Sequence, residues 1–251
     1  MSQIVSNTHV CRELAKNAIP WPTNCSKTDG MDKTGSVGSL DAMVTAMPST
    51  DATTPDWRNT VPRLEGPRIT LREPRAADAT ALFTLLSTDA VSRFISLPPT
   101  TVEGFERYIS WAHRQRSGGQ YVSFAIVPRG SDTPIGLLHV RALGPGFGTA
   151  DWGFVLASEY WGTGIFTEAS ELLLDFAFDV LGAHRLEARA AVCNGRGNGA
   201  MKKLGAEREG VLRHAFFRNG DYLDQVLWSI LREDWQKRRE EKAIWGSSVV
   251  H

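Results

Sequence analysis

A strand, a glycine-rich loop and a long helix follow one another in the middle of this chain. Residues 149–156 read TADWGFVL, residues 160–164 read YWGTG, and residues 165–180 carry apolar side chains at helical spacing. Backbone N–H groups at the start of a helix, with the positive end of the helix dipole behind them, hold phosphate groups without a basic side chain. The sequence therefore predicts a phosphate cradle between this strand and this helix.

The spacing within the loop separates known phosphate cradles. A Walker loop has lysine directly after its last glycine, whereas Gly164 is followed by Ile165, so that motif is excluded. A dinucleotide fingerprint has a third small residue where this chain has Thr167 and an acid at the end of the next strand, whereas Glu187 falls inside its strand. Two alternatives stay open at this point, a dinucleotide site and a plain glycine turn before a core helix.

Two further motifs flank this segment in a fixed order. Residues 71–74 read LREP, and the loop continues into TEA at 167–169. Residues 194–198 read NGRGN and are followed by KLGA at 203–206. Over residues 67–235 the chain resembles the GNAT superfamily of acetyl-coenzyme A-dependent N-acetyltransferases, and within it the RimJ/RimL-like branch that acetylates ribosomal-protein N-termini.

The periodicity of the apolar residues predicts a mixed α+β fold, a central twisted and mostly antiparallel sheet of about seven strands with flanking helices, which agrees with the fold that the resemblance implies. The strands are expected at 68–72, 121–127, 135–141, 149–156, 185–192, 211–217 and 222–231. Helices are expected from residue 78 and at 102–115, 165–180, 197–204 and 233–244. The helix at 165–180 predicts a parallel crossover, and Asn219-Gly220 predicts a hairpin.

Composition divides the chain into three parts. Residues 1–65 are rich in Ser, Thr, Asp, Asn and Pro without a sustained period, so we expect an N-terminal extension that is mostly disordered. Residues 66–235 form the expected N-acetyltransferase domain, and residues 236–251 a C-terminal helical tail.

The overall composition limits which classes of partner and which cellular compartments are expected for this chain. Lys and Arg number 28, as do Asp and Glu, so no global field directs the chain to nucleic acid or to an anionic membrane. The three cysteines are too few for a disulfide framework, the apolar runs are too short for a bilayer span, and the N-terminus lacks a secretory pattern. We expect a cytoplasmic monomer or homodimer that binds no nucleic acid and no membrane.

Transfer of an acetyl group to an amine needs a proton acceptor. Asp151 interrupts an apolar strand just before the loop and is the first candidate for the catalytic base, with a solvent-facing strand residue as the alternative. Glu187 is the second candidate, with an ion pair to Arg185 or Arg189 as the alternative. The single histidines His139 and His184 have no Cys or His partners at metal spacing, so no metal is expected.

The resemblance implies acetyl-coenzyme A as cosubstrate and an amine acceptor, either a protein N-terminus or a small amine. Gly153 is a place where a strand can splay and leave an open edge for the pantetheine arm, and the same splay would leave a backbone N–H as an oxyanion donor. Asn194 is expected on the arm, with a helix N-cap as a compatible alternative. The coenzyme-binding residues predicted in this way are Phe154, Val155, Leu156, Trp161, Gly162, Thr163, Gly164, Ile165, Phe166, Asn194, Asn198 and Lys203.

Three positions depart from the family pattern. Gly197 stands where the family often has a serine and Met201 where it has a tyrosine, so neither usual proton donor for the leaving thiolate is present. A thiolate with a pKa near 8.5 leaves with water as its proton donor. Glu159 replaces a glutamine or arginine at the start of the loop. The missing serine and tyrosine favour one rival function, a non-catalytic acetyl-coenzyme A sensor or scaffold. A second rival, an NAD(P)-binding oxidoreductase, follows from the dinucleotide alternative for the glycine loop.

Overall fold

The structure is a computed structural model that describes residues 56–247 of the chain. The expected extension at 1–55 and the last residues of the expected tail, 248–251, lie outside the described residues. Residues 56–65, which the composition assigned to the extension, are described, and Trp57 and Val61 among them are buried in the core. Among the described helices, none combines the length and the apolar character needed to cross a membrane.

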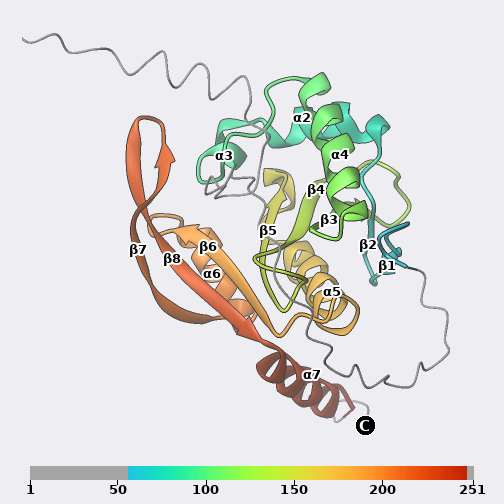
Figure 1. Ribbon diagram of the computed structural model, residues 1–251, viewed down its shortest axis with the longest axis vertical. Coiled ribbons are helices and arrows are strands. Elements are labelled where there is room, and N and C mark those ends of the chain that lie inside the picture. The colour runs from blue at the N-terminus through green and yellow to red at the C-terminus, as the bar shows by residue number, and fades with distance from the viewer. Residues whose placement is uncertain (1–55, 248–251) are drawn as a thin grey trace, which may run out of the picture.

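A single sheet of eight strands runs through the described part, in the order β1-β2-β3-β4-β5-β6-β8-β7 (Figure 1). Every neighbouring pair is antiparallel except β5 and β6, which are parallel. The strands are β1 (Leu64–Glu65), β2 (Ile69–Arg72), β3 (Tyr121–Pro128), β4 (Gly136–Ala142), β5 (Thr149–Leu156), β6 (Arg185–Ala191), β7 (Glu207–Arg218) and β8 (Asp221–Leu231). The mixed fold, the antiparallel meander over β3–β5 and the parallel crossover through the following helix are thus confirmed.

The helices cover the sheet on both faces. Their bounds are α2 (Ala79–Leu86), α3 (Asp89–Ser92), α4 (Val102–Ser117), α5 (Ile165–Asp179), α6 (Gly195–Lys203) and α7 (Arg232–Ser247), with short 3-10 turns at Ala76–Asp78 and Ser158–Tyr160. Successive residues of a strand point to opposite faces. Phe124 and Leu138 accordingly join the core under α5, whereas Ala125 and Leu137 join a second core under α2 and α4.

The parallel pair β5 and β6 separates soon after it forms. The register joins Thr149 to Arg185, Ala150 to Leu186 and Asp151 to Glu187, and no pairing between the two strands continues beyond Asp151. On its other side β5 stays paired with β4 along its whole length to Leu156. The edge of β5 from Trp152 onward therefore faces a gap between the two halves of the sheet, as Figure 1 shows.

Two short elements were not predicted from the sequence, and the start of one strand differs by four residues from the prediction. The two-residue strand β1 and the four-residue helix α3 are too short to show a period, so periodicity missed both. The strand β7 starts at Glu207, whereas the sequence predicts a start near 211. The prediction missed the first residues because they are mostly polar and pair with β8 with register shifts. The predicted Asn219-Gly220 turn is confirmed, and both residues have positive φ (51° and 90°).

The last helix, α7, packs back on the domain. Trp235 is buried and its indole Nε1 donates to Asp175 Oδ1 on α5 at 2.8 Å. Arg239 pairs with Asp179 on the same helix, with 2.7 Å between Nη1 and Oδ2. The beginning of the segment expected as a helical tail is therefore anchored to α5.

Candidate active site

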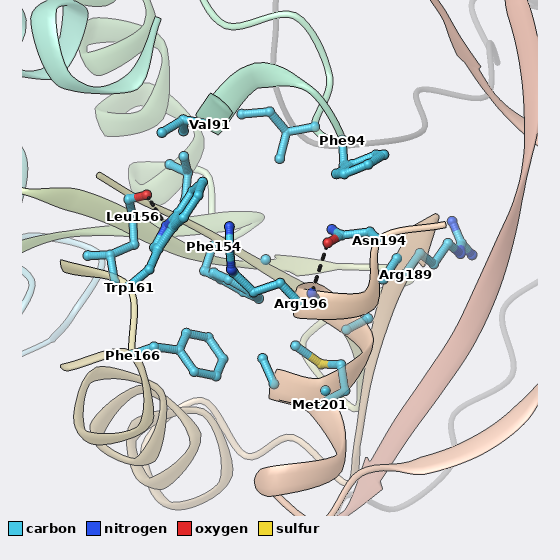
Figure 2. Close-up of a pocket in the computed structure, with 18 of the residues that line it drawn as sticks. Val91, Phe94, Phe154, Leu156, Trp161, Phe166, Arg189, Asn194, Arg196 and Met201 are labelled. Carbon is cyan, nitrogen blue, oxygen red and sulfur yellow. Dashed lines mark hydrogen bonds between the residues drawn. The ribbon is translucent and has the colours of Figure 1, made fainter. Parts of the chain in front are cut away.

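A cavity of about 850 Å³ occupies the gap between the two halves of the sheet (Figure 2). Its walls come from the open part of β5, the loop at 161–164 with the start of α5, the helix α6, and the segment at 90–96 that contains the end of α3. The lining residues labelled in Figure 2 include Phe154, Trp161, Phe166, Asn194 and Met201. The glycine loop and the asparagine-led helix, which lie far apart in the sequence, thus line one cavity.

The glycine loop is held in place by side chains beneath it. Gly164 caps α5 with φ 83°, a left-handed conformation that favours glycine. Arg68 ties the loop to β2, because its Nη1 donates to Thr163 O at 2.7 Å and its Nε donates to Glu168 Oε2 at 2.7 Å. The first N–H groups of α5 cannot find partners inside their own helix. The loop therefore presents backbone donors on a rigid support, which is what a phosphate cradle needs.

The open edge of β5 offers backbone groups to a ligand. Residues 152–156 line the cavity and have no strand partner on the side of β6. Leu156 is an exception within this edge, because its carbonyl already accepts the indole N–H of Trp161 at 2.9 Å. An extended, amide-bearing ligand can add to such an edge as a strand does.

The helix α6 forms the opposite wall and begins with an unusual run of glycines. Asn194 caps it by accepting from Gly197 N at 2.9 Å, so the N-cap alternative for this residue is confirmed. Asn198 is fully engaged inside the protein: its amide nitrogen donates to Ala191 O and Asn194 O, both at 2.9 Å, and its oxygen accepts from Trp228 Nε1 at 2.9 Å. These contacts fix α6 to β6 and β8 in spite of its low helix propensity.

Arg196 spans the cavity between its two walls. Its guanidinium carbon lies 3.8 Å from the centroid of the Trp161 ring, a cation–π contact from α6 to the glycine loop (Figure 2). Because this contact joins the two sides of the gap, Arg196 has to shift for a ligand that fills the space between them. This pairing could not be predicted from the sequence, since a single arginine within a glycine-rich stretch has no partner that spacing can identify.

Asp151 lies at the base of the gap and is almost completely buried, with 3% of its surface exposed. It does not line the cavity. Burial raises the pKa of its carboxyl to about 6, while Arg141 and Arg189 oppose this rise. Arg141 Nη2 lies 3.4 Å from Asp151 Oδ2. The carboxyl is therefore ionised at neutral pH and can still take up a proton under mildly acidic conditions.

His139 lies between Asp151 and the cavity and was not among the predicted site residues. Its Nε2 is 4.0 Å from Asp151 Oδ2, and its ring stacks on Tyr121 with 5.3 Å between centroids. Burial lowers the pKa of His139 to about 3, with Arg141 adding to the effect, so the ring is neutral and the contact with Asp151 is not an ion pair. His139 lines the cavity, and its buried Nε2 has no hydrogen-bond partner among the described residues.

Glu187 is part of an ion-pair chain on the same face of the sheet. It accepts from Arg185 Nε at 3.0 Å, and Arg189 Nη2 lies 3.8 Å from its other oxygen. Arg185 in turn pairs with Glu209. Glu187 does not line the cavity. Its contacts are those of the ion-pair alternative, with Arg185 and Arg189 as partners.

The predicted coenzyme residues fall into two groups. Those that line the cavity are Phe154, Val155, Leu156, Trp161, Gly162, Gly164, Phe166, Asn194 and Lys203. Thr163, Ile165 and Asn198 do not line it; Thr163 instead donates from Oγ1 to Tyr160 O at 2.7 Å and stabilises the loop. Cavity residues that sequence reasoning missed include His139, Arg189, Arg196 and Gln225, as well as the α3 segment. Within the described residues, no group of three or more His, Cys, Asp or Glu is arranged to hold a metal ion.

Comparisons with known proteins show the family of this chain. Residues 68–207 match the acetyltransferase (GNAT) domain, more than half of the chain. The N-acetyltransferase YoaA of Bacillus subtilis, itself uncharacterised, is 29% identical over 177 residues, 68% of this chain and 97% of YoaA. A GCN5-related N-acetyltransferase from Brucella melitensis superposes with a TM-score of 0.60 at 25% identity, over 70% of this chain and 80% of that one. RimJ of Mycobacterium smegmatis, solved with CoA-disulfide, shares the fold with a TM-score of 0.59 at 24% identity, over 66% of this chain and 83% of RimJ.

This chain belongs to the GNAT family and is an acyltransferase of the N-acetyltransferase type. The resemblance of its three ordered motifs to that family is therefore confirmed, and the dinucleotide-binding alternative for the glycine loop is set aside.

Proposed function

We propose that the protein transfers an acetyl group from acetyl-coenzyme A directly to a primary amine, with both substrates bound together and no covalent enzyme intermediate. The observation that carries this proposal is the cavity itself, which joins a glycine cradle and an open strand edge in one gap of the sheet. A buried carboxyl, that of Asp151, lies at the base of this gap, outside the cavity lining. The acceptor is a small amine or a protein N-terminus. RimJ is the structural relative whose complex with CoA-disulfide supports the choice of cosubstrate.

The residues present fit acetyl-coenzyme A. The N–H groups at the start of α5, behind Gly164, would hold the pyrophosphate, and the open edge at Phe154 and Val155 would pair with the pantetheine arm. Asn194 borders the same arm, and Lys203 is on the same wall of the cavity. The thioester supplies the acetyl group and a thiolate that leaves readily.

The chemistry requires one bond to form and one to break. The amine nitrogen attacks the thioester carbonyl, the C–N bond forms, the C–S bond breaks, and the proton of the amine passes to a base. A backbone N–H on the open edge of β5 would stabilise the oxyanion. We propose Asp151 as the base, with Glu187 as the second candidate; because Asp151 does not line the cavity, the proton would reach it through His139 or water.

Gly197 lies close to the side chain of Asn194, the residue that caps α6. A Cβ on Gly197 would lie 2.6 Å from Asn194 Nδ2, so any side chain there would displace the asparagine that caps α6. With Met201 also unable to donate a proton, water is the proposed proton donor to the leaving thiolate, which needs little assistance at its ordinary pKa of about 8.5.

The binding half of the proposal is tested by calorimetry with acetyl-coenzyme A and, separately, NAD. We expect acetyl-coenzyme A to bind and NAD not to bind. Initial velocities at varied concentrations of both substrates should then give intersecting lines, the pattern of a ternary complex. Parallel lines would indicate a covalent acetyl-enzyme and would overturn the direct-transfer mechanism.

A further inference from the structure

The charged residues that line the cavity all carry positive charge. They are Arg93, Arg189, Arg196 and Lys203, and none of the described lining residues is Asp or Glu. Asp151 and Glu187, which lie opposite one another where β5 and β6 part, are outside the lining and face arginines. A second ammonium group on an acceptor would therefore meet cations without a carboxylate to pair with, whereas an anionic group would meet several donors.

Three residues that line the cavity each carry a buried polar atom without a hydrogen-bond partner among the described residues. These atoms are His139 Nε2, Arg189 Nε and Gln225 Oε1, and Gln225 is only 2% exposed. The register pairs Gln225 with Ala191, two residues from Arg189, so Arg189 and Gln225 share one face of the sheet. Buried polar atoms without partners are costly, so this wall of the cavity has polar groups that the surrounding protein does not satisfy.

Arg189 is the donor best placed among these residues to bind an anion. Its Nη2 is 3.8 Å from Glu187 Oε2, too far for a hydrogen bond, and Glu187 is already bonded to Arg185 at 3.0 Å. Its side chain is 17% exposed, which leaves it reachable from the cavity but largely desolvated. A planar guanidinium in such a place suits a carboxylate, because the two can form parallel hydrogen bonds.

We infer that the acceptor is a small primary amine that also carries a carboxylate, an amino acid or a related amino-carboxylate, and that Arg189 recognises this carboxylate. This inference rests on the proposed function, since it concerns the acceptor of the same site. Arg189 donates to the carboxylate, the amino group lies toward His139 and the gap, and polyamines are poor acceptors.

The test compares each amino acid with its own amide, which keeps the amino group and removes the negative charge. The twenty L-amino acids, their amides and spermidine are assayed with acetyl-coenzyme A. For the best acceptor we expect kcat/KM to be about 10- to 100-fold higher for the acid than for the amide, the usual worth of a charged hydrogen-bonded pair. Spermidine should be acetylated least.

Variants assign this preference to Arg189. In Arg189→Met the ratio of acid to amide should fall close to one, mainly through a higher KM for the acid, while Arg189→Lys should retain part of it. Arg107→Met removes an exposed arginine of α4 outside the cavity and serves as the control, with the ratio unchanged. Melting temperatures of all three variants exclude a loss of folding as the cause.

The failure of this inference differs from the failure of the proposed function. An amide used as well as its acid would show that the site accepts uncharged or peptide-like amines and would overturn the inference alone, as would a preference for spermidine. If no amine is acetylated, the binding of the acid and of the amide is measured by calorimetry on the protein saturated with coenzyme A. Tighter binding of the acid supports the inference and contradicts only the transfer reaction. Equal binding of the two, or no binding, contradicts the inference.

Discussion

The ring of His139 lies directly against Gly153 on the neighbouring strand, so closely that a Cβ on Gly153 would be 2.6 Å from His139 Cε1. The glycine thus gives the ring room to stack on Tyr121 and to reach the cavity. The same glycine is on the edge of β5 that β6 leaves open. One residue therefore serves both the free strand edge and the position of the imidazole.

Gly153→Ala should destabilise the protein by about 1–3 kcal/mol, because the added methyl group forces the buried ring out of its place. His139→Ala removes the obstacle, so the double variant should be more stable than the sum of the two single changes predicts. Urea unfolding of the four proteins measures this coupling. Gly210→Ala is the control, since a Cβ there meets nothing within 4 Å; additive effects at 139 and 153 would show that the ring moves freely.

Gly164→Val should weaken the binding of acetyl-coenzyme A by about tenfold or more, because a branched side chain would stand at the start of the cradle. The substitution also strains a backbone with φ 83°, and its Cβ would lie 3.1 Å from Arg68 Nη2. Gly130→Val has the same kind of strain, with φ 81° and open space around it, and should leave the affinity unchanged. Calorimetry on both folded variants separates the effect of the side chain on the site from the effect of backbone strain. If Gly164→Val binds acetyl-coenzyme A with the same dissociation constant as the wild type, the loop is not part of the site.

Asp151→Asn should lower kcat by about 10²- to 10⁴-fold with little change in coenzyme affinity, if Asp151 takes the proton of the amine. The wild-type rate should fall below a pH of about 6, where the carboxyl becomes protonated, and the variant should lose this acidic limb. Glu187→Gln is the comparison and should have the smaller effect, because Glu187 is engaged with Arg185. The reverse order of effects would transfer the role of base to Glu187.

The raised pKa of the Asp151 carboxyl should make the stability of the protein depend on pH. Its pKa is about 6 in the folded protein and about 3.8 without burial, so the folded state holds the proton more tightly in this interval. Its contribution is favourable below pH 3.8 and is lost as the pH rises to about 6, a change of roughly 2–3 kcal/mol. Relative to Asp151→Asn, the wild type should therefore lose stability between pH 4.5 and 7 in urea unfolding. A constant difference between the two proteins would mean that the carboxyl is not desolvated.

The sequence predicted most of the sheet because its strands are short segments rich in apolar residues and the turns between them carry Gly, Pro or Asn. It also predicted three of the segments that line the cavity, because the strand at 149–156, the loop at 160–164 and the helix after Asn194 have recognisable spacing, whereas it missed the segment at 90–96. The lateral contacts could not be predicted from one sequence. Gly153 lies opposite His139 because of the register between β4 and β5, which the sequence does not specify. The contact of Arg196 with Trp161 depends on how far the two halves of the sheet separate.

The candidate bases show the same limit. Asp151 and Glu187 were chosen because they are acids on strands beside the loop, and the structure does place them opposite one another at the point where β5 and β6 part. Alternation along a strand cannot say whether such a residue reaches the cavity or is buried behind another side chain. For Asp151 the intervening residue is His139, which only the three-dimensional arrangement reveals.

The most direct test of the account is the release of free thiol from acetyl-coenzyme A by the wild-type protein, with and without an amine. We predict a rate that depends on the amine and equals the rate at which one acetylated amine appears by mass spectrometry. The Asp151→Asn protein should bind acetyl-coenzyme A but release thiol far more slowly. Thiol release that is absent with every amine, in a protein that binds the coenzyme, would contradict the account and leave a coenzyme-binding protein without transferase activity.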